Sequence, residues 1–299
     1  MNYNNRLVLS AQQTGSIVCL GLDPVVESMP EPKGIEFFPG FVEELLVEMK
    51  EQNVLPGAFK PNQGFYVMHD KPLEGKFAGS NALANTMKWI RRELPQVPII
   101  LDFKRGDIAT SSANYAKEGF ECWGADAVTI APYMGTDSVM PFAKYCGIQW
   151  EKGVYVLNRT SNKGAVDLQD LETRFGHQEQ KMYKAVARKI VEWAKENPGV
   201  GAVVGATSLL ELSDLARFYS EKNIPLLIPG VGGQGGKAYE VAAALRDAGY
   251  NLELARINSS SGITHPWAKD KKPAPADYVK VCVEELHKLN EAIGFKAVA

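Results

Sequence analysis

The sequence predicts a (β/α)8 barrel that forms a single domain. Eight short runs rich in Val, Ile and Leu are each followed by a polar tip and then by a segment with helical periodicity. The chain has 299 residues, which accommodates a barrel of ~250 residues with some longer loops. An open doubly wound sheet is the alternative, but it usually has fewer strands, and no GxGxxG follows the first strand.

The predicted strands are spaced regularly along the chain. They span residues 16–23, 57–62, 97–104, 125–132, 153–160, 201–207, 224–230 and 252–259. Amphipathic helical patterns fall between them, with one apolar face formed by Phe41, Leu45, Leu46 and Met49 and another by Leu209, Leu212, Leu215, Ala216 and Tyr219. Segments 178–196 and 275–293 are also predicted to be helical. The surplus length lies in inserted loops near residues 24–38, 67–80, 162–177 and 265–276, none of which resembles a domain linker.

Composition excludes several classes of protein. The formal net charge is -2 and the pI is about 6.2, so no broad cationic surface for nucleic acid is expected. The four cysteines form no CxxC pair, the N-terminus lacks an apolar signal core, and no stretch of ~18 apolar residues could span a membrane. We therefore expect a cytoplasmic protein with free thiols. The four histidines show no metal-ligand spacing and are expected at the surface.

Polar residues gather where the predicted strands end. The first strand ends at Asp23, the second carries Lys60, and the third runs into "LDFKRGDI" (101–108), with Asp102, Lys104 and Asp107. The fifth, seventh and eighth strands run into "NRTSNKG", "PGVGGQGG" and "ARINSSSG". The carboxyl ends of barrel strands build the active site, so these residues are expected to meet at one mouth.

The third strand places opposite charges on one face. Side chains alternate along a strand, so Asp102 and Lys104 should point into the mouth while Phe103 packs outward. A purely structural salt bridge would explain an isolated Asp-x-Lys. With Lys60 and Asp23 on neighbouring strands, a functional cluster is the favoured interpretation.

The glycine-rich segment 229–236 is typical of a phosphate site. It exposes backbone N–H groups after the seventh strand, where barrels of this kind often bind phosphate. Gly233, Gln234 and Gly235 are the predicted ligands. Arg256, or the hydroxyls of residues 259–261, could complete the site from the eighth strand.

Together these strand ends resemble one enzyme family. The string Asp102-x-Lys104-x-x-Asp107-Ile108 is similar to the D-x-K-x-x-D-I signature of orotidine 5'-monophosphate decarboxylases. The segments "GLDP", "FKPNQGFY", "TSNKG" and "PGVGGQGG" resemble, in order, further motifs of the family, and "INSSSGI" resembles the last strand end of its longer, bacterial-type branch. The resemblance implies conversion of orotidine 5'-monophosphate to uridine 5'-monophosphate and CO2, the last step of de novo pyrimidine synthesis. It also implies a homodimer with shared active sites and neither a metal nor an organic cofactor.

The resemblance further implies a role for each matching residue. Lys104 would donate the proton to C6 of the pyrimidine, beside Asp102. Lys60 would complete the charge array and reach the ribose, together with Asp23. Asp107 and Ser111, the latter standing where the family usually has Thr, would reach across the dimer. The remaining matches are Ser161 for the pyrimidine and Gln234 with the glycine amides for the phosphate.

Two departures from the family pattern concern the loops. Lys163 replaces a usual proline in the pyrimidine loop, and Ser261 stands where the family has its phosphate arginine. We therefore expect Arg256, five residues earlier, to reach the phosphate instead.

Two other functions compete with decarboxylation. A related barrel enzyme that acts on a sugar phosphate with Mg²⁺ would need an acidic residue where this chain has Lys60. A nucleotide-binding protein without catalysis would tolerate loss of the charge array, yet all four of its members are present, namely Lys60, Asp102, Lys104 and Asp107. Physical chemistry favours the decarboxylase, because a fixed ammonium can stabilise charge on an sp² carbon and then act as a general acid.

Overall fold

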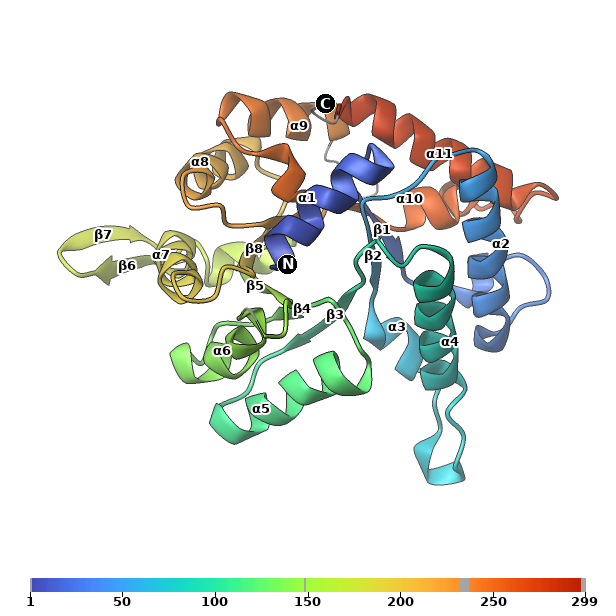
Figure 1. Ribbon diagram of the computed structural model, residues 1–299, viewed down its shortest axis with the longest axis horizontal. Coiled ribbons are helices and arrows are strands. Elements are labelled where there is room, and N and C mark those ends of the chain that lie inside the picture. The colour runs from blue at the N-terminus through green and yellow to red at the C-terminus, as the bar shows by residue number, and fades with distance from the viewer. Residues whose placement is uncertain (1, 148, 232–236, 297–299) are drawn as a thin grey trace.

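The computed structural model describes residues 2–147, 149–231 and 237–296. Eight parallel strands follow the order β2-β1-β10-β9-β8-β5-β4-β3, which confirms the predicted barrel (Figure 1). The strands are β1 (Val18–Leu22), β2 (Ala58–Pro61), β3 (Ile100–Arg105), β4 (Ala127–Ile130), β5 (Gly153–Arg159), β8 (Val200–Val204), β9 (Leu226–Ile228) and β10 (Ala255–Ser259). Each observed strand lies inside the range of a predicted strand or extends beyond it by a single residue.

The barrel closes between β2 and β3, which we call the β2–β3 seam. Among the described residues, two isolated parallel bridges join these strands, Phe59 with Ile99 and Asn62 with Asp102. The other neighbouring strands are joined by longer ladders. The polar residues of the second and third strand ends therefore face each other across the least regular joint of the barrel.

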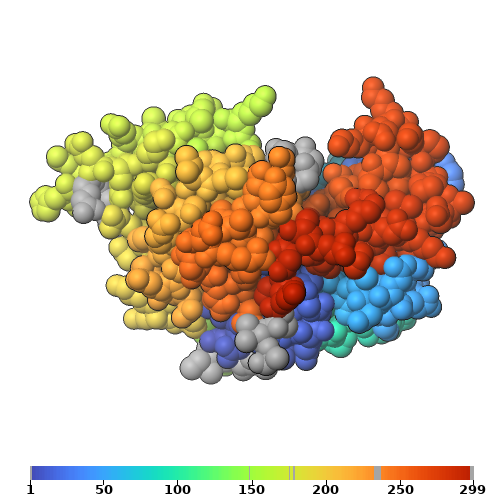
Figure 2. Space-filling view, turned by 90° about the horizontal axis from the view of Figure 1, so that it is seen from above, coloured from blue at the N-terminus to red at the C-terminus, as the bar shows by residue number. Residues whose placement is uncertain are grey.

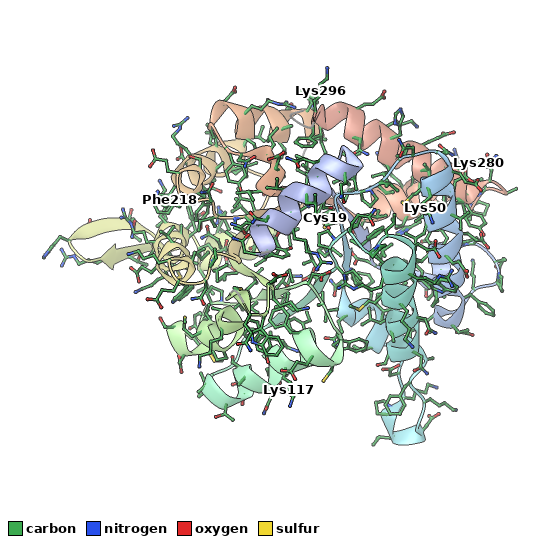
Figure 3. The ribbon with its side chains drawn as sticks, viewed as in Figure 1. Cys19, Lys50, Lys117, Phe218, Lys280 and Lys296 are labelled. Atoms are coloured by element: carbon green, nitrogen blue, oxygen red, sulfur yellow. The ribbon has the colours of Figure 1, made fainter. Side chains whose placement is uncertain are left out.

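Helices surround the strands and bury their apolar faces. They are α1 (Tyr3–Thr14), α2 (Phe38–Glu51), α3 (Gln63–Val67), α4 (Ala78–Glu93), α5 (Ala109–Lys117), α6 (Thr136–Ala143), α7 (Met182–Ala194), α8 (Leu209–Ser220), α9 (Ala238–Asp247), α10 (Ser261–Thr264) and α11 (Tyr278–Ile293). The predicted faces of α2 and α8 are buried, apart from the partly buried Leu209. Figure 3 shows Cys19 inside the ring of strands, and Lys50, Lys117 and Lys280 on outer helices.

The inserted loops contain short ordered elements. Single helical turns occupy Val26–Ser28, Pro72–Glu74, Lys163–Asp167 and Pro266–Asp270. An antiparallel hairpin of β6 (Glu172–Phe175) and β7 (Gln178–Lys181) replaces the loop and helix start that the sequence predicted there. The hairpin sequence is polar throughout, so it carries no apolar alternation to reveal its strands. Figure 1 shows it projecting from the barrel beside α7.

Helix α1 covers the amino-terminal end of the barrel and was not predicted. Asn2 caps its first turn, and Gly15 ends it in a left-handed conformation. The helix buries Tyr3, Leu7 and Ala11 on one face. Figure 1 shows α1 lying across the ring of strands.

Arg256 fastens this helix to the strands. Its side chain is fully buried and donates hydrogen bonds to four backbone carbonyls, of Leu7 (2.6 Å), Gly57 (3.0 Å), Glu253 (3.0 Å) and Ala255 (2.7 Å). The carbonyl of Leu7 lies in α1, and the other three precede or begin strands β2 and β10. All four are therefore at the opposite end of the barrel from the mouth. The prediction that Arg256 binds phosphate is therefore wrong: as the second residue of β10, it lies at the wrong end of the strand.

Within the described ranges, no helix is long and apolar enough to cross a membrane. The expected cytoplasmic location stays a prediction.

Replacing Arg256 should destabilise the fold. In Arg256→Met four backbone carbonyls, three of them in buried hydrogen bonds, lose their donor, so we expect the free energy of unfolding to fall by about 3–5 kcal/mol. Arg246→Met is the matched control, because Arg246 also binds two carbonyls, of Ile293 and Gly294, but at a more exposed position. Urea unfolding measures both. An Arg256→Met loss no larger than the control's would contradict this role.

Candidate active site

The centre of the site is a buried carboxylate that binds two ammonium groups. Asp102 Oδ2 lies 2.9 Å from Lys60 Nζ, and Asp102 Oδ1 lies 2.6 Å from Lys104 Nζ. The hydroxyl of Thr129, on β4, also donates to Oδ1 at 2.7 Å. Asp102 and Lys60 side chains are only 7% and 5% exposed, whereas Lys104 is 49% exposed. Lys104 is thus the ammonium that an incoming molecule can reach.

Burial and charge act in opposite directions on this pair. Burial alone would raise the pKa of Asp102, but Lys60 and Lys104 outweigh it and hold that pKa well below its usual range. Burial alone would lower the pKa of Lys60, but Asp102 and Asp23 outweigh it and raise that pKa above its ordinary value. Both side chains therefore stay charged at neutral pH.

Lys104 reaches Asp102 through an irregular backbone, not through simple alternation. Its φ is +43°, a left-handed conformation that is rare for residues other than glycine. It lies in a bulge: between the pairs Leu101–Val128 and Arg105–Ile130, β3 advances four residues while β4 advances two. The predicted convergence of Asp102 and Lys104 is confirmed, but strand alternation alone does not produce it. Phe103 is buried beside Phe142 of α6, as expected of an outward-packing residue.

Asp23 lies next to this cluster at the end of β1. Its Oδ1 accepts a hydrogen bond from the backbone N–H of Asn62 at 3.2 Å, and its charge acts on Lys60. Gly21 has a clear packing reason in the same strand, since a Cβ there would lie 1.8 Å from Ser260 Oγ. The ends of β1, β2 and β10 therefore meet closely.

Asp107 and Ser111 stand apart from the cluster. Asp107 Oδ1 accepts a hydrogen bond from Ile108 N at 2.7 Å, and within the described part of the chain no ion pair joins it to Lys104. Ser111 is exposed in the first turn of α5. One chain thus brings Lys60, Asp102 and Lys104 together, but leaves Asp107 and Ser111 outside.

Ser161 follows β5 on another side of the mouth. A Cβ on Gly205, after β8, would lie 2.9 Å from the backbone of Ser161, so glycine permits this close approach. The preceding Thr160 exchanges hydrogen bonds with the side chain of Gln169, at 2.9 and 2.7 Å. The loop that carries Ser161 is therefore held from both sides.

Residues 232–236 of the predicted phosphate segment, which include Gly233, Gln234 and Gly235, lie outside the described residues. Where β9 and β10 end, a cavity of about 770 Å³ is lined by residues that include Val231, Ser259, Ser261, Gly262, His265, Lys269 and Lys288. Lys288 pairs with Glu285 at 2.7 Å, whereas no ion pair of Lys269 occurs within residues 237–296 or the other described ranges. Lys269, in the loop predicted at 265–276, is a cation that the motif analysis missed.

His265 is, after Arg256, a second residue whose location was predicted incorrectly from the sequence. It was expected at the surface, but it is only 4% exposed, and its Nδ1 lies 2.9 Å from Thr264 Oγ1. Burial lowers its pKa despite the nearby charge of Asp23. The run "GITHP" is too short to carry a periodicity that could have revealed this, and its burial comes from the packing of α10 against β1 and α11.

The strand order sets these groups in sequence around the mouth. From β3 the ring continues through β2, β1, β10 and β9, so Lys104, Lys60, Asp23, Ser259 and Val231 follow one another. A cavity of about 350 Å³ adjoins Lys104 and Asp102 at one end of this arc, and the larger cavity lies at the other. Figure 2 shows the segments after β5 (yellow-green) and β10 (orange-red) standing above the surface between them.

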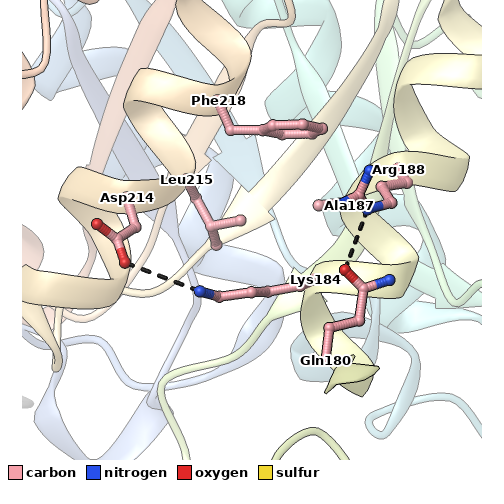
Figure 4. A pocket seen from close by; sticks show the side chains of 7 residues that line it. All are labelled: Gln180, Lys184, Ala187, Arg188, Asp214, Leu215 and Phe218. Carbon is pink, nitrogen blue, oxygen red and sulfur yellow. Dashed lines mark hydrogen bonds and ion pairs between the residues drawn. The ribbon is translucent and has the colours of Figure 1, made fainter. Parts of the chain in front are cut away.

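Another cavity, of about 230 Å³, lies between α7 and α8 (Figure 4). Its charged side chains are already engaged: Lys184 lies 3.9 Å from Asp214, and Arg188 donates to Gln180 at 3.0 Å. No barrel-strand residue lines it, so it is separate from the charge cluster. Among the described residues, no group of three or more His, Cys, Asp and Glu side chains could hold a metal ion.

Comparisons with known proteins agree with this geometry. A family model described as orotidine 5'-phosphate decarboxylase / HUMPS family matches residues 74–265. The chain is 37% identical over 254 residues to an orotidine 5'-phosphate decarboxylase of Thermomicrobium roseum, covering 83% of this chain and 82% of that protein.

Solved structures give the same result. The OMP decarboxylase of Leishmania donovani is 30% identical, with a TM-score of 0.72 and coverage of 98% of this chain and 99% of that one. A putative orotidine 5'-phosphate decarboxylase of Streptomyces avermitilis, 24% identical, has a TM-score of 0.77 with coverage of 100% and 96%, and supports the fold. The protein therefore belongs to the orotidine 5'-phosphate decarboxylase / HUMPS family of enzymes.

Proposed function

We propose that this enzyme decarboxylates orotidine 5'-monophosphate to uridine 5'-monophosphate and CO2, the last step of pyrimidine synthesis. The observation that carries the proposal is the buried Asp102 with an ammonium on each oxygen, one of them exposed beside a cavity. The curated relatives' names supply the substrate class.

In the proposed step, Lys104 stabilises charge and then donates a proton. The C6–carboxylate bond of the substrate breaks, CO2 leaves, and the electron pair stays on C6. The ammonium of Lys104 stabilises that pair electrostatically and transfers its proton to C6, which completes the product. Asp102 holds Lys104 in place beforehand and repels the substrate carboxylate. No metal or organic cofactor is needed in this scheme.

The remaining strand ends fit the rest of a nucleotide. With C6 beside Lys104, the ribose would lie near Lys60 and Asp23, and the phosphate near β10 and β9, because the ring of strands follows that order. Ser161, across the mouth, would contact the pyrimidine. Gly233, Gln234 and Gly235 remain the proposed phosphate ligands of the glycine-rich segment. Binding energy from the remote phosphate can then contribute to the reacting end.

Lys269 is the proposed counter-charge of the phosphate. Arg256 is committed to the opposite end of the barrel, and Ser261 supplies no charge. Lys269 lines the same cavity as Ser259, Ser261 and Gly262. A lysine suits this role as a point charge for phosphate.

We further propose a homodimer with shared active sites. Asp107 and Ser111 lie outside the charge cluster of their own chain, in a segment with three exposed apolar side chains nearby, Ile108, Tyr133 and Met134. Burying such side chains against a second copy is favourable and would bring Asp107 toward the neighbouring site.

The Mg²⁺-dependent sugar-phosphate reaction is less well supported. Lys60 Nζ lies 2.9 Å from Asp102, where that reaction would call for an acidic metal ligand on β2. An ammonium there repels a divalent cation.

The decarboxylase proposal predicts activity in the presence of EDTA. Purified protein should consume orotidine 5'-monophosphate, followed by its absorbance, at the same rate with and without the chelator. Lys104→Ala should lose turnover by about a thousandfold or more while still binding uridine 5'-monophosphate, because the variant lacks the proton donor but keeps the nucleotide contacts. Lys117→Ala, an exposed lysine of α5, is the control. Activity that requires Mg²⁺ on another substrate would refute the proposal.

Shared sites predict complementation between two inactive variants. Lys104→Ala and Asp107→Ala subunits should each be inactive alone, but one site of a mixed dimer regains both groups. An equimolar mixture should therefore recover about a quarter of the wild-type rate, since half of the dimers are mixed and each has one intact site. Native mass spectrometry verifies subunit exchange. If exchange is verified and the rate stays at the level of the single variants, the sites are not shared.

The phosphate assignment predicts a loss that depends on the ligand. Lys269→Met should weaken binding of uridine 5'-monophosphate about tenfold or more, because a charged hydrogen bond is lost. Binding of uridine, which lacks the phosphate, should not change. Lys271→Met, in the same loop but not lining the cavity, is the control. Calorimetry measures both ligands, and equal losses for both would argue against a phosphate contact.

A further inference from the structure

Lys104 occupies a backbone conformation that needs support from its surroundings. Its left-handed φ of +43° is unfavourable for a lysine, and such residues persist where neighbouring structure holds them. On one side, the Lys104 backbone N–H donates to Thr129 Oγ1 at 3.1 Å. On the C-terminal side of Lys104, the backbone is held by Arg105, whose carbonyl accepts a hydrogen bond from Ala131 N at 2.8 Å.

The Arg105 side chain closes a triangle of hydrogen bonds with Glu118 and Gln63. Its guanidinium donates to both carboxylate oxygens of Glu118, at 2.9 and 3.2 Å, and to Gln63 Oε1 at 2.9 Å. Gln63 Nε2 in turn donates to Glu118 Oε1 at 3.0 Å. The guanidinium also lies 5.0 Å from the ring of Phe103 and 4.9 Å from that of Tyr115. We call these three hydrogen-bonded residues the Arg105 triangle.

The triangle connects three separate elements. Arg105 ends β3, Gln63 begins α3 two residues after the end of β2, and Glu118 begins the helical segment Glu118–Cys122 after α5. Gln63 is buried at 6% exposure. Burial alone would raise the pKa of Glu118, but Arg105 and Gln63 outweigh it and lower that pKa, so the carboxylate stays charged.

The triangle also lies at the β2–β3 seam. Asn62, adjacent to Gln63, forms one of the two isolated bridges of the seam, with Asp102. The cavity of about 350 Å³ is lined both by Asp102 and Lys104 and by Gln63 and Arg105. A shift of the triangle would therefore move the two strand ends that carry Lys60 and Lys104.

We propose that Arg105 is a positioning residue: through Glu118 and Gln63 it holds the ends of β2 and β3 so that Lys104 stays against Asp102 beside the cavity. The inference rests on the proposed decarboxylase function for its kinetic test. Arg105 itself contacts neither Lys60 nor Lys104 side chains in the described residues, so it acts through the backbone that it fixes.

The kinetic test is the variant Arg105→Gln. We expect kcat to fall about thirtyfold or more, since a displacement of about 1 Å at a reacting group has effects of this size. The Kd of uridine 5'-monophosphate should stay within about threefold, and the unfolding midpoint within about 3 °C, because partly exposed ion pairs contribute little stability. Arg105→Lys should recover part of the loss, because an ammonium keeps the charge but cannot bridge both partners.

Glu118→Gln provides an independent arm of the test. It breaks the same triangle from the other side, so it should lower kcat similarly, and the double variant should lose no more than either single one. Arg92→Gln is the matched control, since Arg92 of α4 also contacts a carboxylate, Glu93, and an aromatic ring, Trp89, but belongs neither to the triangle nor to the lining of the cavity. It should keep the wild-type kcat.

Crystal structures of the wild type and of Arg105→Gln test the positioning role of Arg105 without an activity measurement. The variant should show Lys104 Nζ displaced from Asp102 or a changed Lys104 φ. Wild-type protein that is inactive on orotidine 5'-monophosphate would refute the proposed function, and the crystal comparison would still decide this inference. Any one of four results would overturn the inference. These are an unchanged kcat, additive losses in the double variant, an unmoved Lys104, or losses of kcat, ligand binding and stability that are equal in size.

Discussion

The carboxylate of Asp102 is the constraint on which the active end of the barrel depends. It is buried, and it binds Lys60 from β2, Lys104 from β3 and Thr129 from β4. A buried carboxylate without such partners would carry a large desolvation penalty and would be driven to take up a proton. The ion pairs that keep it charged also hold three neighbouring strand ends in place. Charge and geometry at this site are therefore set by the same contacts.

The irregular backbone around Asp102 follows from the same demand. A regular ladder between β2 and β3 would give more backbone hydrogen bonds, but the described residues have two isolated bridges there. Beyond Asp102 the pairing of β3 with β4 is bulged, which turns the Lys104 side chain back toward the carboxylate. The opposite end of the barrel is arranged differently. There, Arg256 binds carbonyls and α1 covers the strands, so the rigid packing that supports the site lies away from it.

Sequence reasoning could predict the features that leave a periodic or local pattern. The eight strands, the burial of the α2 face and the meeting of Lys60 with Asp102 follow from apolar runs and from the rule that strand ends share one mouth. Arg256 could not be placed in the same way, because its partners, the backbone carbonyls of Leu7 and Gly57, are remote in sequence. Every residue has such a carbonyl, so the residue types give no sign of the contact. The burial of His265 and the hairpin at residues 172–181 also depend on tertiary packing or polar pairing. A motif indicates which residues to expect at the site, but not which carbonyl or carboxylate holds them.

The exposure of Lys104 connects the proposed chemistry to the proposed homodimer. Both oxygens of Asp102 are already engaged by donors of the protein, so a substrate carboxylate placed beside it meets repulsion rather than new hydrogen bonds. Charge that develops on the reacting carbon is attracted to Lys104 instead, and both effects favour loss of CO2. Water weakens such interactions, and the Lys104 side chain is 49% exposed in the single chain. A bound nucleotide and a second copy carrying Asp107 would cover that side. In this scheme the dimer completes the low-dielectric environment in which the fixed ammonium is effective.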